Sequence, residues 1–377
     1  MKNWVLAVVV VLLVGCTAKV NVQTETVTPV QTSSAFETPK SAKNIIFLVG
    51  DGMGVTQITS GMLSNNNTLH LERMKHIGFS KTSSTSGPIT DSAAGATAFS
   101  IGEKTFNGAV GVDNEGNPKT TLLELLGNQG YSTGLIATCK ITHATPASYY
   151  AHQKSRNMGY EIAADMVQAP VNLFIGGGKS HFENRTNPDE GQIDDRNIIS
   201  ELEAKGFTFV NSLTELASTS GNVGYFIAEG HPKAIKDGRD DIFPRSIQPS
   251  IAHLQKESDK GFFLIAEGAQ IDWGGHANDG NFIVTEMLDF DQAVGQALDF
   301  AEQDGNTLVV VTADHETGGF ALGANGRDYS DMQAQFTTPG HSAVMVPVYA
   351  FGPGAEYFMG TYENNTIYAK MLAALGK

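Results

Sequence analysis

Six continuous apolar runs between residues 45 and 351 constrain the fold of this chain more than any other feature. They are IIFLV at 45–49, TGLIAT at 133–138, NLFIGG at 172–177, GFFLIA at 261–266, TLVVVTA at 307–313 and VPVYAF at 346–351. Runs that lack regular polar alternation are typical of strands in a sheet covered on both faces. We therefore expect a central sheet that lies between two layers of helices.

Helical patterns separate these runs. TTLLELLGNQG at 120–130 is one, and VTEMLDFDQAVGQALDFAEQ at 284–303 places apolar residues at three- and four-residue steps. Alternation of strand and helix predicts a doubly wound α/β fold with a mostly parallel sheet sandwiched by helices, in one domain over residues 44–377. The polar stretch 181–260 is the least legible part of the sequence. It is either an insertion into this α/β domain or a cap on it.

The first sixteen residues predict export. An apolar stretch from Trp4 to Val14 follows Lys2 and is too short to span a bilayer, as in a signal segment. Its end, LVGC at 13–16, resembles a lipobox, which would make Cys16 a lipid-anchored first residue; an ordinary signal peptide that discards Cys16 is the alternative. Residues 17–43 suit a flexible tether, so we expect a periplasmic protein or a membrane-anchored lipoprotein.

Charge narrows the range of partners. The chain has a formal net charge of -15 and no Lys/Arg-rich run, which argues against a nucleic-acid surface. A phosphate site in such a chain must create positive potential locally, with metal ions or a placed arginine. Cys139 is the only other cysteine besides Cys16, and its apolar surroundings predict a buried thiol.

Polar side chains follow three of the predicted strands where ligands bind in open α/β sheets, beyond the carboxyl ends. The residues are Asp51 after the first run, Glu267, Asp272 and His276 after the fourth, and Asp314, His315 and Glu316 after the fifth. Mixed Asp and His ligands suit Zn²⁺, whereas all-oxygen sets suit Mg²⁺. Three such clusters together predict a metal centre, although each alone has a structural explanation as a cap or turn.

Ser92, in TDSAAGATAFS, is the candidate nucleophile. It begins a run of small residues that predicts a helix N-terminus, where free N–H groups favour an anion. No GxSxG elbow surrounds it, so activation by a metal is a better interpretation than a hydrolase triad. The GGGKS and GDGMGV segments lack the spacing of nucleotide-binding motifs, because Leu173 and Val55 stand where glycines are needed.

With these residues in view, the sequence resembles the alkaline phosphatase family from about Asn44 to near the C-terminus. The stretches that carry the resemblance are FLVGDGMG, TDSAAGATA, THATPASYYAHQKSR, the GGG before Lys179, FFLIAEGAQIDWGGHAND, VVVTADHETGG and TPGHSAVMVPVYAFGPG. The family implies hydrolysis of phosphate monoesters through a phosphoserine on Ser92, with two zinc ions and one magnesium.

The resemblance also implies roles for individual residues. One zinc would be held by Asp272, His276 and His341, and the other by Asp51, Asp314 and His315. The magnesium would share Asp51 and add Thr145 and Glu267, while Arg156 would clamp the phosphate beside Asp91. His143 and Trp273 depart from the best-known bacterial members, which have Asp and Lys there, so magnesium and phosphate affinity are expected to differ.

Other functions fit the sequence less well. A sulfatase needs x-Pro-x-Arg after its nucleophile, but AAGA follows Ser92; Arg156 and the third-metal set argue against a diesterase. An exported lipoprotein that only binds metal or phosphate would be expected to lack part of the set. The family commonly forms homodimers, so a homodimer is expected. The remaining histidines have no motif and are predicted to be surface or packing residues: His70, His76, His152, His181, His231 and His253.

Overall fold

A ten-stranded sheet organises the computed structural model, which describes residues 41–377 except the side chain of residue 331. The predicted signal segment and nearly all of the predicted tether lie outside the described residues, and Pro39–Lys377 forms a compact unit. The strands are β1 Asn44–Gly50, β2 His76–Lys81, β3 Ser132–Lys140, β4 Leu173–Gly177, β5 Phe207–Phe209, β6 Asn222–Phe226, β7 Phe262–Gly268, β8 Thr307–Thr312, β9 Glu316–Thr317, β10 Ala321–Asn325, β11 Asp328–Gln335, β12 His341–Ser342, β13 Val346–Phe351 and β14 Gly360–Glu363. The α-helices are α1 Val55–Ser64, α2 Ser92–Ile101, α3 Leu122–Asn128, α4 Ala144–Ala147, α5 Gly159–Asp165, α6 Ile198–Ala204, α7 Leu213–Ser218, α8 Ile242–Glu257, α9 Gln270–His276, α10 Gly280–Asp304 and α11 Thr366–Ala374.

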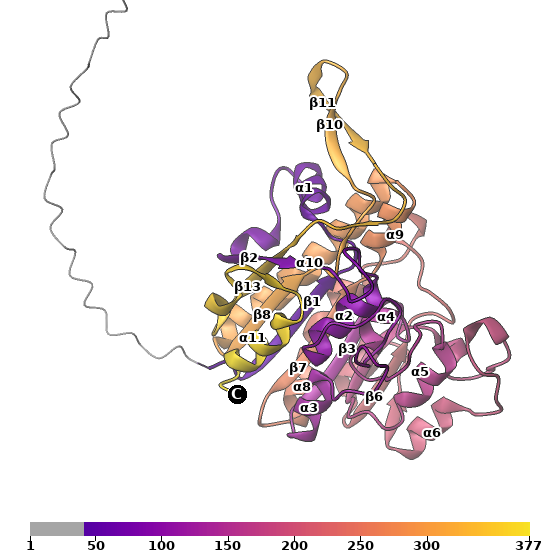
Figure 1. The fold of residues 1–377 in the computed structure, drawn as a ribbon. Coiled ribbons are helices and arrows are strands. Elements are labelled where there is room, and N and C mark those ends of the chain that lie inside the picture. The colour runs from indigo at the N-terminus through magenta and orange to yellow at the C-terminus, as the bar shows by residue number, and fades with distance from the viewer. Residues whose placement is uncertain (1–40) are drawn as a thin grey trace, which may run out of the picture. The chain divides into compact units, whose positions relative to one another are not determined.

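The strands of the main sheet stand in the order β14-β2-β13-β8-β1-β7-β3-β4-β6-β5 (Figure 1). Every neighbouring pair is parallel except the two pairs that β13 makes, with β8 and with β2. This agrees with the predicted mostly parallel sheet. The order also places β1, the first strand of the sheet, between β7 and β8.

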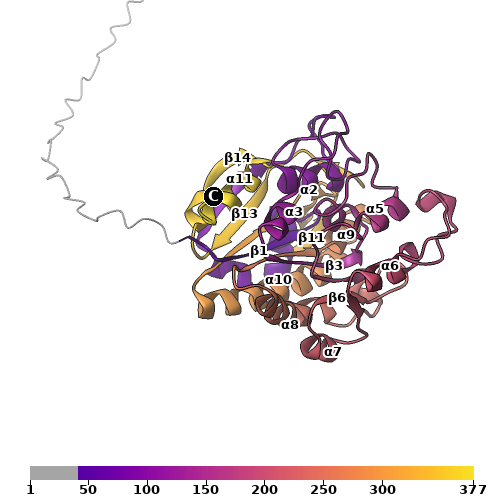
Figure 2. The same ribbon diagram turned by 90° about the horizontal axis from the view of Figure 1, so that it is seen from below.

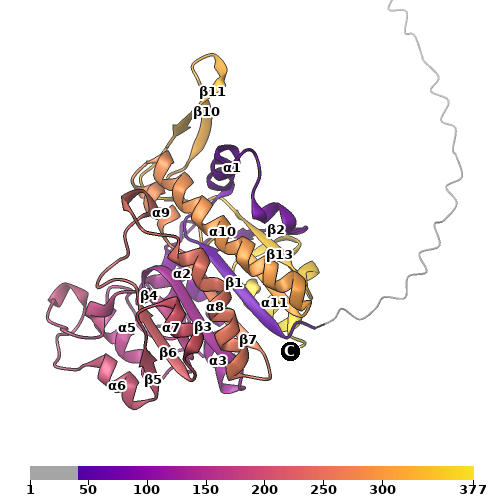
Figure 3. The same ribbon diagram turned by 180° about the vertical axis from the view of Figure 1, so that it is seen from behind.

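Helices cover the sheet on both faces, as the continuous apolar runs predicted. Along β1, Ile45, Phe47 and Val49 pack into the core that α2, α3 and α11 share, whereas Ile46 and Leu48 pack with α8 and α10. Figure 2, seen from below, shows the strands between α8 and α10 on one side and α2 and α3 on the other; Figure 3 shows α8 and α10 crossing the sheet from behind.

The predicted elements match the observed ones with small shifts at their ends. All six apolar runs are strands, and the segment at 120–130 contains α3, which a Thr121–Glu124 capping box begins. The helix expected at 284–303 starts at Gly280, because the Asp279 carboxylate accepts hydrogen bonds from the N–H groups of Asn281 and Phe282.

The polar stretch 181–260 continues the α/β layers. It supplies β5 and β6 at one edge of the sheet and α8, which packs on β3 and β7. A short hairpin of β10 and β11 extends beyond α1 in Figures 1 and 3, and the sequence pattern did not predict it. Among residues 41–377, no helix has the length and apolar character that a membrane crossing requires.

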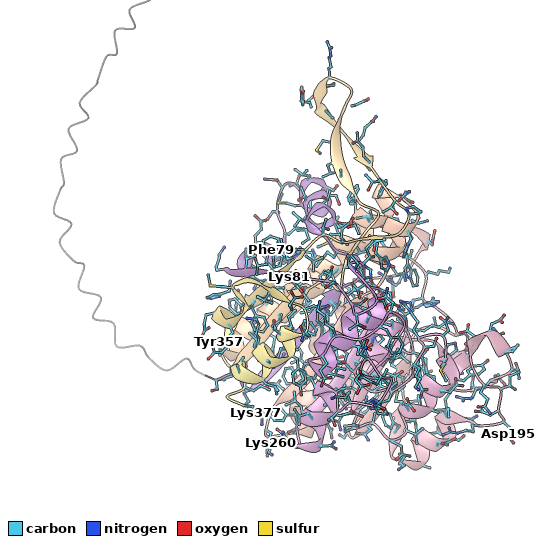
Figure 4. The ribbon with its side chains drawn as sticks, in the orientation of Figure 1. Phe79, Lys81, Asp195, Lys260, Tyr357 and Lys377 are labelled. Atoms are coloured by element: carbon cyan, nitrogen blue, oxygen red, sulfur yellow. The ribbon has the colours of Figure 1, made fainter. Side chains whose placement is uncertain are left out.

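Replacement of Phe47 by alanine is expected to lower the free energy of unfolding by about 3–5 kcal/mol. Its ring is fully buried on the central strand and meets Phe99 edge to face, with 5.6 Å between ring centroids. Phe79→Ala is the matched control, because Phe79 lies on the partly exposed face of β2 at the flank of the unit (Figure 4). Urea unfolding at constant metal content measures both; equal losses would contradict the assignment of the core.

Candidate metal centre and active site

The ends of three adjacent strands bring the predicted acidic and histidine residues together. Gly50 of β1 lies opposite Gly268 of β7, and β8 lies against the other side of β1 in the same direction. From these ends the chain continues into Asp51, into α9 and into Asp314. Because β13 is antiparallel to β8, it begins at this edge, and β12 with His341 precedes it there.

Gly52 allows the turn after β1 to lie close to α9. Its φ is +71°, and a Cβ added there would lie 2.7 Å from the Asp272 Cα. Its N–H donates a hydrogen bond of 3.2 Å to Asp314 Oδ1. A side chain at position 52 would therefore strain the turn and push apart the two strand ends that carry candidate ligands.

Asp51, Asp314 and His315 form a fully buried cluster. His315 Nε2 lies 3.5 Å from Asp51 Oδ1 and 3.2 Å from Asp314 Oδ2. The second oxygen of Asp51 and Asp314 Oδ2 have no hydrogen-bond partner. A buried carboxylate oxygen without a partner is costly, and one nitrogen with two carboxylates fits Zn²⁺.

Asp272, His276 and His341 form a second cluster, which is open to solvent on the His276 side. The two histidine Nε2 atoms are 3.2 Å apart, and they lie 3.4 Å and 3.6 Å from the Asp272 carboxylate. Each Nδ1 is paired with a backbone carbonyl, at 2.6 Å to Pro339 and 2.8 Å to Thr90. An Nδ1–H donated in this way leaves the Nε2 lone pairs free to bind one cation.

A third cluster is made of oxygen atoms. Asp51 Oδ2, Thr145 Oγ1 and Glu267 Oε1 are buried and have no hydrogen-bond partner. Besides burial, the Glu267 charge contributes to the raised pKa of Asp51, and Thr145 acts on the pKa of Glu267, so the three groups lie near one another and suit a harder cation such as Mg²⁺. The buried Cys139 thiol donates to Glu267 Oε2 at 3.1 Å, leaving Oε1 available. The apolar run around Cys139 predicts a buried thiol, but nothing in the sequence pairs positions 139 and 267, so this contact could not be predicted.

The electrostatics of the site call for bound cations. Burial and the neighbouring Asp314 carboxylate raise the pKa of Asp51 well above its usual range, and burial raises the pKa of Glu267 to about 7. Burial would also raise the pKa of Asp314, but the His315 imidazole outweighs it and holds that pKa below its usual value. Carboxylates this close in a buried site stay ionised together only when positive charge is supplied.

Ser92 faces the buried cluster from the first turn of α2. Its hydroxyl oxygen is 3.3 Å from His315 Nε2 and 3.5 Å from Asp51 Oδ1, and the residue is 2% exposed. Asp91 caps the helix by accepting a hydrogen bond of 3.0 Å from the Ala94 N–H. The structure thus places the candidate nucleophile at a helix N-terminus and against the candidate metal ligands.

Arg156 is held in one orientation from two sides. One terminal nitrogen donates to Asp91 Oδ2 and the other to His143 Nε2, each at 3.1 Å. Burial and the positive charge of Arg156 lower the pKa of His143 well below its usual value, so the imidazole is neutral and can accept this bond. Three N–H groups of the guanidinium remain for an oxyanion.

Trp273 and His231 complete one wall of the site beside His143. The ring centroids are 4.9 Å apart for His231 and Trp273, 5.6 Å for His231 and His143, and 6.3 Å for His143 and Trp273, all edge to face. His231 is exposed, as predicted, but its place beside the site was missed. The one sequence signal is that it follows β6 at the ligand-binding edge.

Glu316 supports the site without belonging to a ligand cluster. It accepts hydrogen bonds from the Gln57 side chain and the Phe320 N–H, both at 2.9 Å, and from the Ser342 hydroxyl. It therefore ties α1 and β12 to the end of β8. Asp279, the other acidic neighbour considered in the sequence, caps α10.

Cation binding to the metal-free protein is expected to release more protons at pH 6 than at pH 9. At pH 6 the pKa of about 7 keeps Glu267 largely protonated, and a cation displaces that proton; at pH 9 Glu267 is already ionised. Calorimetry in buffers of different ionisation enthalpy counts the protons. The Glu267→Gln variant should release fewer protons at pH 6 than the unaltered protein. If the unaltered protein released equal numbers of protons at both pH values, the prediction would be contradicted.

Comparisons with known proteins identify the family of the chain. The family model described as alkaline phosphatase matches residues 42–333. Alkaline phosphatase 3 of Bacillus subtilis is 34% identical over 88% of this chain and 89% of its own length, and alkaline phosphatase of Escherichia coli is 31% identical over 89% and 87%.

Solved structures show the same similarity. Alkaline phosphatase from the Antarctic bacterium TAB5 superposes with a TM-score of 0.85 at 41% identity, covering 90% of this chain and 99% of that one. A variant of that enzyme, with aspartate in place of one histidine, has Mg bound in a site called M3. The chain described here belongs to the alkaline phosphatase family of phosphomonoester hydrolases.

Proposed function

We propose that this chain hydrolyses phosphate monoesters to an alcohol and inorganic phosphate, with Ser92 as the nucleophile. The observation that carries the proposal is the position of Ser92 Oγ, within 3.5 Å of two candidate ligands and at the N-terminus of α2. Membership of the chain in the alkaline phosphatase family supports hydrolysis of phosphate monoesters as the reaction class. Among residues 41–377, no other hydroxyl of the site combines these two features.

The donor sets support two zinc ions and one magnesium. Asp51, Asp314 and His315 would hold one zinc, Asp272, His276 and His341 the other, and Asp51, Thr145 and Glu267 the magnesium. When bound, these cations would supply the positive charge that lowers the hydroxyl pKa and offsets charge on the reacting oxygens. The unpartnered buried oxygens are the structural support for this assignment.

The residues of the chain have distinct parts in the proposed reaction. Ser92 Oγ forms a bond to phosphorus as the bond from phosphorus to the alcohol oxygen breaks, which leaves a phosphoserine, and the serine proton goes to the departing alcohol oxygen. A water oxygen then bonds to phosphorus as the bond from phosphorus to Ser92 Oγ breaks, which releases phosphate, and a proton of the water goes to Ser92 Oγ. The N–H groups of the first turn of α2 and the free N–H groups of Arg156 face the phosphoryl oxygens.

Arg156 supports a preference for monoesters over diesters. Its orientation is fixed by Asp91 and His143, so its free donors are offered to two oxygens at once. A monoester has three terminal oxygens and can satisfy this clamp while it also faces cations, whereas a diester has two.

Hydrolysis of a chromogenic phosphate monoester at alkaline pH tests the proposal. Ser92→Ala is expected to lower kcat by at least about a hundredfold, because the covalent step needs the hydroxyl, and a chelator should abolish the activity of the unaltered chain. Ser100→Ala is the matched control on the same helix, since that buried hydroxyl only bonds the Thr97 carbonyl. Full turnover by Ser92→Ala, or activity that resists chelation, would overturn the mechanism.

We also propose that the protein is exported and anchored through Cys16, on the basis of the LVGC sequence at 13–16. Cys16→Ala is then expected to abolish incorporation of labelled fatty acid and to move the activity out of the membrane fraction. If the unaltered chain takes up no label, the ordinary signal peptide becomes the better assignment. The homodimer implied by the family resemblance stays a prediction.

A further inference from the structure

His231 lies at the edge of the candidate active site, where it contacts Trp273, His143 and the backbone of Lys140. Its ring packs edge to face against Trp273 and His143, and its Nδ1 accepts a hydrogen bond of 3.2 Å from the Lys140 N–H. Trp273 lies on α9 next to the candidate ligand Asp272, and His143 bonds Arg156. His231 therefore touches both the helix that carries a metal cluster and the side chain that orients the phosphate clamp.

The loop that carries His231 is held rigidly on both sides. Gly230, the residue before it, accepts a hydrogen bond of 2.8 Å from the Gly178 N–H at the end of β4. The Gln270 amide of α9 donates to the carbonyl oxygens of Pro232 and Lys233, at 3.2 Å and 3.3 Å. The same Gln270 amide also donates to Thr138 of β3, so one side chain joins the His231 loop to α9 and to the strand before His143.

A buried ionic cluster holds the far end of this loop. Arg239 donates to Glu286 at 2.6 Å and to Asp289 at 2.8 Å, and all three side chains are almost completely buried against α10. Glu286 also accepts a hydrogen bond of 2.8 Å from the Ile235 N–H. If the loop shifted, Arg239 would move away from its partners and leave buried charges uncompensated. Because this is costly, the loop has little freedom to shift.

Two cavities meet at His231. One, of about 270 Å³, is lined by His143 and Arg156 of the phosphate clamp, and the other, of about 620 Å³, lies over the Gly230–Asp240 loop; His231 lines both. The His231 ring at this boundary also packs edge to face on Trp273 and so restricts rotation of the indole. Packing alone therefore gives His231 a means to fix the wall of the site.

We propose that His231 is a positioning residue of the oxyanion site: its ring holds Trp273 and His143 in place and so raises the affinity for inorganic phosphate and for the phosphoryl group of the substrate. The inference rests on the proposed function, because it concerns the same site. Edge-to-face aromatic pairs contribute enough to change such an affinity by about two- to tenfold. The metal clusters do not include His231, so zinc content should not depend on it.

The sequence supplies a specific probe for the test. The chain has two tryptophans, Trp4 and Trp273, so the full chain with Trp4→Phe reports Trp273 fluorescence alone. In this parent, His231→Ala is expected to shift the emission to longer wavelength and to increase quenching by acrylamide. The inhibition constant of inorganic phosphate and KM should both rise about two- to tenfold, while kcat changes by less than about twofold.

Two further variants distinguish the effect of ring packing from the effect of the hydrogen bond with the Lys140 N–H. His231→Phe keeps an aromatic ring but loses the acceptor for the Lys140 N–H, whereas His231→Asn keeps an acceptor and loses the ring. If ring packing positions the wall, the emission and phosphate inhibition of the Phe variant should stay closer to the parent than those of the Asn variant. The reverse order would overturn the proposal and assign the effect to the backbone bond.

His253→Ala is the matched control. His253 is a buried histidine on α8 whose Nε2 pairs with the Gly221 carbonyl at 2.9 Å, and its substitution should leave Trp273 emission and phosphate inhibition unchanged. If His231→Ala matches the parent in both readouts while the parent hydrolyses the ester, this inference alone fails. If the parent has no activity and no response to phosphate, the proposed function fails.

Discussion

Concentrated negative charge is the constraint on which this structure depends. Asp51, Glu267, Asp272 and Asp314 are at most 4% exposed and converge on one edge of the sheet. Burial raises the pKa values of Asp51 and Glu267 and so disfavours their ionised forms. The nearest arginine, Arg156, is already paired with Asp91. The fold thus creates a deficit of positive charge at one place in a chain whose formal net charge is -15. Divalent cations of the kind that these donor atoms suit would fill that deficit.

The sheet topology is what makes such a concentration possible. Because β1 lies between β7 and β8, segments more than two hundred residues apart in sequence end side by side and in register. The antiparallel strand β13 adds His341 to the same edge, although it comes from near the end of the chain. Helices on both faces bury the strands, so the ligands are carried by the least mobile part of the fold.

The sequence predicted the central strands and most of the site because both have strong local signals. Continuous apolar runs identified β1, β7 and β8, and acidic and histidine residues directly follow them. The strands β2, β5, β6 and β14 are short or half exposed, so they lack such runs, and the hairpin of β10 and β11 has little buried apolar surface. His231 and the Cys139–Glu267 contact depend on strand order, which no local pattern of residues specifies.

The carbonyl of Thr90 joins two functions through a single atom. It accepts the Nδ1–H of His341, and it lies two residues before Ser92 in the segment that leads into α2. The imidazole of this candidate metal ligand is therefore fastened to the main chain that carries the candidate nucleophile. Any movement that carried α2 away from the sheet would turn this imidazole as well, so the same piece of backbone sets the positions of both side chains.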